Sequence, residues 1–258
     1  MVNKMGYFAP LTLTLCLATS LTWQATEKVR ARDLFLSGSE TPTKKSELPV
    51  TSESDKTIQN PKTSAAAPLG LRYSILKQMS GGETLEVDPD SIFHSGDRIR
   101  LSIEANDNGY LYIVLRGSSG NWSLLFPSNE ILGGNNTVEK GGHYEIPLGT
   151  VWFAFDEHAG REKLFIVLSR QPEPNLEKLI QSLRQDPKST SGQEPAGTQV
   201  VDDEVVGKIR NQVASRDLIL EKVNENSPGE KKEKAVYVVN RTGSTDSRVV
   251  VDVSLNHQ

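Results

Sequence analysis

The sequence has 258 residues, of which 36% are hydrophobic, and its 29 Lys and Arg against 33 Asp and Glu give a formal net charge of −4. Because no dense basic stretch interrupts this acidic balance, the composition argues against nucleic acid as a partner. A folded unit of roughly 190 residues buries about 70% of its unfolded surface, so such a chain needs neither a disulfide nor a metal ion for stability.

The first 25 residues are typical of an export signal. Lys4 supplies a positive start, Met5 to Leu17 form a largely apolar run, and the small residues Ala18 to Ser20 suit a cleavage site. Residues 1–25 are therefore predicted to be a signal peptide, and the protein to be exported to the periplasm or the extracellular space. The alternative is an uncleaved N-terminal anchor, because residues 5–23 nearly reach the about 20 apolar residues that a membrane span needs.

Cleavage would leave a mature protein with no stable membrane span and no thiol, since the single cysteine, Cys16, lies inside the apolar run. The absence of cysteine from the mature chain excludes disulfide scaffolds, thiol catalysis and cysteine-based zinc sites.

Residues 26–68 are predicted to be a disordered polar tether. From Ser37 to Pro68 the sequence is rich in Ser, Thr, Pro and Lys and almost lacks large apolar side chains. Such a segment cannot bury enough area to offset the entropy lost on ordering. Upstream, Ala31 to Gly38 form a small apolar island, which we expect to dock either on the domain or on a partner.

Residues 69–258 are predicted to form one mainly-β domain, whose first strands follow a period of two. Arg98–Ala105 alternates apolar and polar side chains, as a half-buried strand does. The Asn and Gly residues at 106–109 predict a tight hairpin turn. Residues 110–116 are apolar on both faces, which indicates a central strand covered on both sides, and 122–126 is the next strand.

The remaining pattern adds further strands and two short helices. Residues 151–156 and 162–169 predict a hairpin, while 174–184 and 202–215 have helical spacing of apolar side chains. Three strands close the chain over residues 217–255. Many short strands with few helices predict an antiparallel β-sandwich or a partly open barrel with two short accessory helices.

Aromatic side chains on predicted strands usually belong to the core, but three are candidate binding residues. Trp122 lies next to the predicted Gly-Ser turn, and Trp152 is out of phase with Val151 and Phe153, so both are expected to face solvent. With Tyr112 they form a predicted surface for stacking on a sugar or a partner peptide.

No catalytic, metal or cofactor site is predicted. Ser74 and Lys77 match an S-x-x-K pattern, but on a strand this spacing places them on opposite faces. His94, His143 and His158 lie in polar, Gly-containing segments without a second ligand at metal spacing. The sequence therefore favours a non-enzyme, and the alternative is an envelope hydrolase whose Ser and His residues meet only in three dimensions.

Three stretches taken together carry a family resemblance: "GDRIRLSIEANDNGYLYIVLRGSSGNWSLLFPS" at 96–128, "NNTVEKGGHYEIP" at 135–147, and "GREKLFIVLSRQPEP" at 160–174. Their order is a strand, a Gly-Tyr turn, a Leu-Phe-Pro strand end, a Tyr-x-Ile-Pro element and a Gly-Arg-Glu turn. Through them the chain resembles, most clearly over residues 69–183, the family called domain of unknown function 4384, and in particular its exported, single-domain bacterial members.

The resemblance implies an accessory role and no catalytic residues. Domains of this family often stand beside kinase, caspase-like or repeat modules in bacteria, whereas this chain has no such neighbour, which favours a free-standing envelope protein. We therefore expect a non-catalytic binding or protein-interaction module. Its expected partner is an envelope protein or cell-wall glycan.

Overall fold

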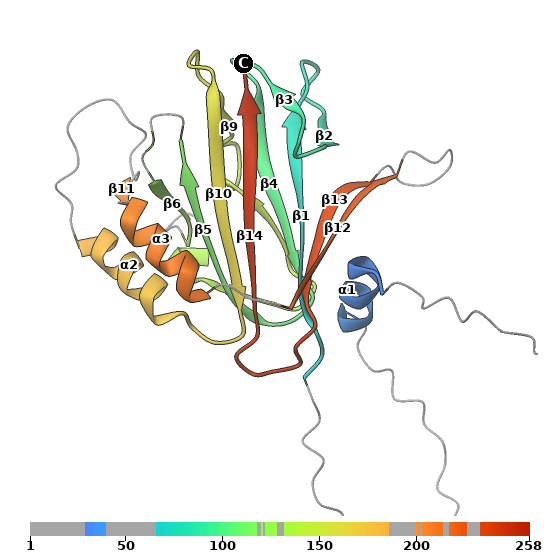
Figure 1. Ribbon diagram of the computed structural model, residues 1–258. Helices are drawn as coiled ribbons and strands as arrows, with labels where there is room; N and C mark the ends of the chain where they lie inside the picture. Colours follow the sequence, from blue (N-terminus) through green and yellow to red (C-terminus); the bar gives the residue numbers. More distant parts are fainter. Residues whose placement is uncertain are drawn as a thin grey trace, which may run out of the picture.

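The computed structural model describes residues 29–39, 66–117, 120, 122–127, 132–185, 200–201, 203–213, 217–225 and 233–258. Within them the predicted mainly-β fold is confirmed. The strands form two seven-stranded sheets, and the backbone does not close into a barrel (Figure 1).

The first sheet has the strand order β12-β13-β1-β4-β8, with β2 paired to β1 and β9 paired to β4. Its strands are β1 (Leu69–Gln78), β2 (Thr84–Val87), β4 (Arg98–Ala105), β8 (His143–Ile146), β9 (Phe153–Ala154), β12 (Leu218–Glu225) and β13 (Glu233–Asn240).

The second sheet has the order β11-β6-β5-β10-β14-β3, with β7 paired to β5. Its strands are β3 (Ile92–Phe93), β5 (Gly109–Arg116), β6 (Trp122–Phe126), β7 (Thr137–Val138), β10 (Gly160–Ser169), β11 (Val200–Val201) and β14 (Arg248–His257). The pairs between long strands are antiparallel, and the short β3 runs parallel to β14.

The core lies between the two sheets, where each long strand contributes alternate residues. Leu71 and Ile75 of β1 face Ile113 of β5, Ile166 of β10 and Val251 of β14 within one buried apolar cluster. Because these residues alternate with outward-facing ones, each strand presents one apolar face to the space between the two sheets.

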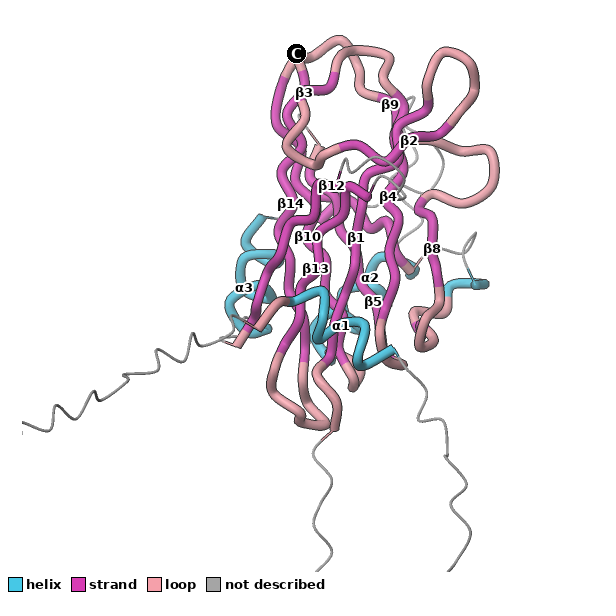
Figure 2. Tube along the Cα trace, turned by 90° about the vertical axis from the view of Figure 1, so that its right-hand side faces the viewer, coloured by secondary structure: helices cyan, strands magenta, loops and turns pink. Residues whose placement is uncertain are grey.

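Three α-helices are described, and they cover the outer faces of the sandwich: α1 (Ala31–Ser39), α2 (Pro174–Gln185) and α3 (Asp203–Val213); a short 3₁₀ turn, η1, spans Leu132–Gly134. Helices α2 and α3, both predicted from the sequence, pack on the outer face of the second sheet, as Figure 1 shows. Helix α1 packs on the outer face of the first sheet and crosses β13 and β1 in Figure 2. The order of layers is thus helix, sheet, sheet, helix pair.

Helix α1 lies inside the range 26–68 for which we expected a disordered tether, so that expectation is wrong over residues 31–39. Phe35 is 1% exposed and its ring meets that of Tyr237 edge-on, with the centroids 5.3 Å apart. Arg32 reaches Glu233 at 3.1 Å, and Arg30 reaches Glu221 at 2.7 Å. The apolar island therefore docks on the domain itself.

The predicted hairpin turn at 106–109 is wrong, because it connects two sheets: β4 belongs to the first and β5 to the second. Asn106 is buried here and holds three chain segments together. Its Oδ1 accepts a hydrogen bond from the Gly70 amide at 2.6 Å, and its Nδ2 donates to the carbonyls of Pro68 at 3.0 Å and Phe35 at 3.4 Å. Asn106, which suggested a turn, is therefore a buried residue that links these segments by hydrogen bonds.

The predicted hairpin over 151–169 is also wrong. Strand β9 is two residues long and pairs with β4, whereas β10 belongs to the other sheet. The loop before β9 covers the outer face of β4, where Arg100 Nε donates to the Val151 carbonyl at 3.0 Å. Arg100 and Ser102 are both buried, although the alternation of β4 had indicated a solvated polar face.

No helix among the described residues is long and apolar enough to cross a membrane.

Candidate functional site: a cationic groove on the second sheet

The outer face of the second sheet is only partly covered by helices. Outward-facing Tyr112, Val114, Phe165 and Val167 pack with the apolar sides of α2 and α3. Farther along the same strands, beyond the helices, the outward positions change from apolar to polar and cationic. This change in side-chain type divides the face into a packed half and an open half.

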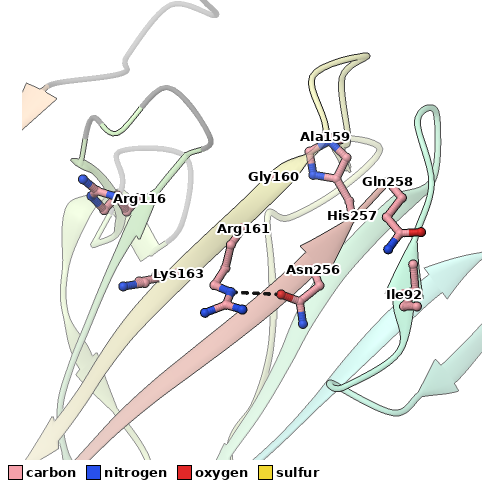
Figure 3. A pocket seen from close by; sticks show the side chains of 9 residues that line it. All are labelled: Ile92, Arg116, Ala159, Gly160, Arg161, Lys163, Asn256, His257 and Gln258. Carbon is pink, nitrogen blue, oxygen red and sulfur yellow. Dashed lines mark hydrogen bonds between the residues drawn. The ribbon is translucent and has the colours of Figure 1, made fainter.

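The open half contains a groove of about 750 Å³. Arg116 at the end of β5, Lys163 and Arg161 on β10, and Asn256 on β14 line it, and Ile92 of β3 lies at its far side (Figure 3). In the sheet register Lys163 stands opposite Arg116, and Arg161 stands opposite Asn256. Antiparallel pairing therefore gathers three cations from two strands into one surface.

Hydrogen bonding orders part of this surface. Arg161 Nε donates to Asn256 Oδ1 at 3.0 Å, which directs the guanidinium along the sheet (Figure 3). Lys163 forms no ion pair with any described residue. Asp252, the acidic residue on the outward face of β14, is bound by Arg210 of α3 at 2.5 Å and does not neutralise the groove.

A buried polar cluster lies at the same end of the sandwich, on the inner side of β10 and β14. The His257 side chain is 0% exposed and its Nε2 lies 3.7 Å from Asp156 Oδ1. Among the described residues neither ring nitrogen has a hydrogen-bond partner. Burial, together with the nearby Asp156 carboxylate, raises the pKa of Glu162 to about 7. The Phe155 ring packs beside this cluster, with its centroid 5.0 Å from that of the His257 ring.

Of the three predicted binding residues, Trp122 and Tyr112 are buried rather than at the surface, so the prediction is wrong for both. Trp122 is 3% exposed and Tyr112 is 1% exposed, because α2 and α3 cover both rings. The Tyr112 hydroxyl donates to Glu177 Oε1 at 2.6 Å and accepts from the Glu173 amide at 3.0 Å, so it fixes the start of α2. Neither ring can stack on a ligand.

Trp152 is partly exposed, but it is occupied. The Arg100 guanidinium lies 4.0 Å from the centroid of its ring, a cation–π contact that holds the loop before β9 against β4. Because this loop packs on the first sheet, the structure does not bring Trp152 together with Trp122 and Tyr112, which belong to the second.

The three histidines noted in the sequence are exposed, and each lies near a carboxylate. His94 lies 3.9 Å from Asp97, His143 lies 3.8 Å from Glu145, and His158 lies 3.6 Å from Asp156. In the described part of the chain none of them hydrogen-bonds to a serine, and no group of three or more His, Cys, Asp and Glu side chains is arranged to hold a metal ion.

The S-x-x-K residues point to different partners, as their strand spacing predicts. Ser74 donates to Glu86 at 3.0 Å, and Lys77 binds Asp97 at 2.5 Å.

Sequence reasoning missed both the groove and His257. Arg161 and Lys163 are two residues apart on a strand, which places them on one face, but only the register adds Arg116 and Asn256. The burial of His257 could have been predicted, because it continues the inward-facing alternation of Val253 and Leu255 on β14.

The fold is a mainly-β sandwich of two sheets, an architecture that hosts many unrelated functions. Residues 92–172 match the model of the family described as domain of unknown function (DUF4384), which confirms the resemblance predicted from the sequence. No curated protein and no solved structure matches the chain.

Proposed function

We propose that this chain is an exported bacterial envelope protein that acts as a non-catalytic binding module, and that the groove lined by Arg116, Arg161 and Lys163 is its binding surface. The partner then carries negative charge where it meets β10. Residues 1–25 act as the export signal in this proposal, and lie outside the described residues.

The observation that carries the proposal is the concentration of positive charge in the groove of a chain whose net charge is −4. Arg72, by contrast, serves the fold, because it binds Glu86 and Glu233 at 2.9 and 3.0 Å. Lys163 lines the open groove and has no acidic partner among the described residues. Such a cation is available to a ligand.

The exposed histidines support the non-catalytic part of the proposal. General-base catalysis on a serine needs an imidazole within about 3 Å of the hydroxyl. His94, His143 and His158 contact carboxylates instead.

The test is a retention experiment with the full mature chain immobilised and presented with envelope extract and with isolated cell-wall glycan. We expect a partner that is retained by the wild type, is released by raising the salt concentration, and is lost with the double variant Arg161→Ser/Lys163→Ser. Lys178→Ser, which removes an exposed cation from α2, is the matched control and should retain the partner. Equal retention by the double variant would refute the groove, and cleavage of the bait would refute the non-catalytic role.

A further inference from the structure

The lining of the groove changes in character from one side to the other. The groove crosses β5, β10, β14 and β3, which are neighbours in that order. Three strand spacings of about 4.8 Å give a span of about 14 Å. Arg116 and Lys163 stand at the β5–β10 side, Arg161 and Asn256 in the middle, and Ile92, which is 53% exposed, at the β3 side (Figure 3).

Each part of this row suits a different group of one extended ligand. Guanidinium and ammonium groups bind carboxylates. The Asn256 side-chain amide can donate to a peptide carbonyl, while its Oδ1 accepts from Arg161. The exposed Ile92 offers an apolar contact. An extended chain advances about 3.3 Å per residue, so about four residues span the groove.

The lining argues against the two simpler ligands. A free phosphate would use the cations and leave Ile92 in water. A glycan is usually held by aromatic stacking, and the one ring among the lining residues belongs to His257, whose side chain is fully buried.

Resting on the binding role proposed above, we propose that the groove binds an extended acidic peptide segment of a partner protein. One or two carboxylates lie at Arg161 and Lys163, the backbone passes Asn256, and an apolar side chain three or four residues farther along packs on Ile92.

The probe is a fluorescein-labelled peptide, Gly-Glu-Asp-Ser-Thr-Leu-Val-amide, titrated with the full mature chain and followed by fluorescence anisotropy. Two matched peptides serve as comparisons: one replaces Glu-Asp with Gln-Asn, and the other replaces Leu-Val with Ser-Ser. We expect each replacement to weaken binding several-fold. Because exposed ion pairs are individually modest, Arg161→Ser and Lys163→Ser should each weaken binding about threefold and together about tenfold.

Variants of the chain separate the two ends of the ligand. Ile92→Ser should weaken the parent peptide several-fold and leave the Ser-Ser peptide unaffected, since the contact it removes is absent there. Lys178→Ser should bind the parent peptide as the wild type does. Equal binding of all three peptides would overturn the proposal.

The outcome also distinguishes this proposal from the binding role on which it rests. If the peptide fails to bind while cell-wall glycan is retained by the wild type and lost with Arg161→Ser/Lys163→Ser, the peptide is wrong and the groove is right. If neither binds and that double variant retains envelope partners as the wild type does, both are wrong.

Discussion

At the scale of single residues, Glu162 makes the stability of the protein depend on pH. Its pKa rises from an ordinary 4.5 to about 7, because the carboxyl is buried and lies near Asp156. The folded state therefore holds a proton that the unfolded state releases between these values. The stability contributed by the neutral carboxyl is fully present below about pH 4.5 and is lost as the pH rises through about 7.

Replacing Glu162 by Gln removes this loss, because the amide stays neutral at every pH. One pKa unit corresponds to about 1.4 kcal/mol. Since the carboxyl keeps some contact with solvent, we expect Glu162→Gln to gain only about 1 to 2 kcal/mol over the wild type at pH 8. Urea unfolding midpoints between pH 4 and 8 measure this, with Glu157→Gln, an exposed carboxyl nearby, as the control. A gain that persists at pH 4 would contradict the prediction.

Asn106 gives a second prediction at this scale. It is 1% exposed and satisfies the Gly70 amide and the Pro68 carbonyl. Asn106→Ala removes the partner of the buried Gly70 amide and of the part-buried Pro68 carbonyl, and an unsatisfied buried group costs about 1 to 3 kcal/mol. We expect a loss of about 2 to 4 kcal/mol in the free energy of unfolding, measured in urea. Asn108→Ala, at an exposed position two residues away, should cost less than about 1 kcal/mol. A loss as small as this in Asn106→Ala would show that the bridge is unimportant.

Single-residue environments were the part of the site least predictable from the sequence. Trp122 next to a turn was expected in solvent, yet α2 and α3, far along the chain, cover it. Trp152 was expected to face solvent, and no local pattern pairs it with Arg100 across the sheet. Exposure of a strand side chain depends on the next layer, and that layer comes from distant sequence.

At the scale of elements, α1 is the one whose attachment can be tested alone. This helix is not part of either sheet, and Phe35 is its largest buried side chain. Truncating a buried Phe costs about 3 kcal/mol or more, which is enough to undock a nine-residue helix. We expect Phe35→Ala to expose α1 while the sandwich remains folded.

The neighbouring Leu36 provides the control, because it is 47% exposed on the same helix. Limited proteolysis followed by mass spectrometry should show new cleavage within residues 31–39 for Phe35→Ala and none for Leu36→Ala. Far-UV circular dichroism should show the same strand content in both. Protection of α1 in Phe35→Ala would mean that the ion pairs of Arg30 and Arg32 hold the helix without the ring.

Elements with their own periodicity were predictable, and those defined by a partner were not. Strand β5 and helices α2 and α3 were expected where they occur, because their apolar spacing is read from consecutive residues. Strand β9 was expected to pair with β10 and pairs with β4 instead. A two-residue strand carries no information about which sheet it joins.

At the scale of the whole molecule, the sandwich depends on pairing between distant parts of the chain. Strand β4 pairs along its whole length with β1, and β10 pairs along its whole length with β14. The family match over residues 92–172 includes β4 and β10 but neither of these partners. The matched segment is therefore smaller than the folded unit.

This difference gives a prediction about fragments. A polypeptide of residues 92–172 would expose one edge of β4 and one edge of β10, and it would lack the β1, β13 and β14 side chains that complete the core. Unpaired buried backbone groups and a half-filled core both oppose folding. We expect this fragment to show no cooperative thermal transition by circular dichroism, whereas residues 29–258 should unfold in one transition. Because β14 supplies the outermost long strand of the second sheet, a chain ending at residue 247 should also fail to fold, and it would lose the groove with Asn256. A cooperative transition in the 92–172 fragment would show instead that the family segment is a self-sufficient core and that β1 and β14 are additions to it.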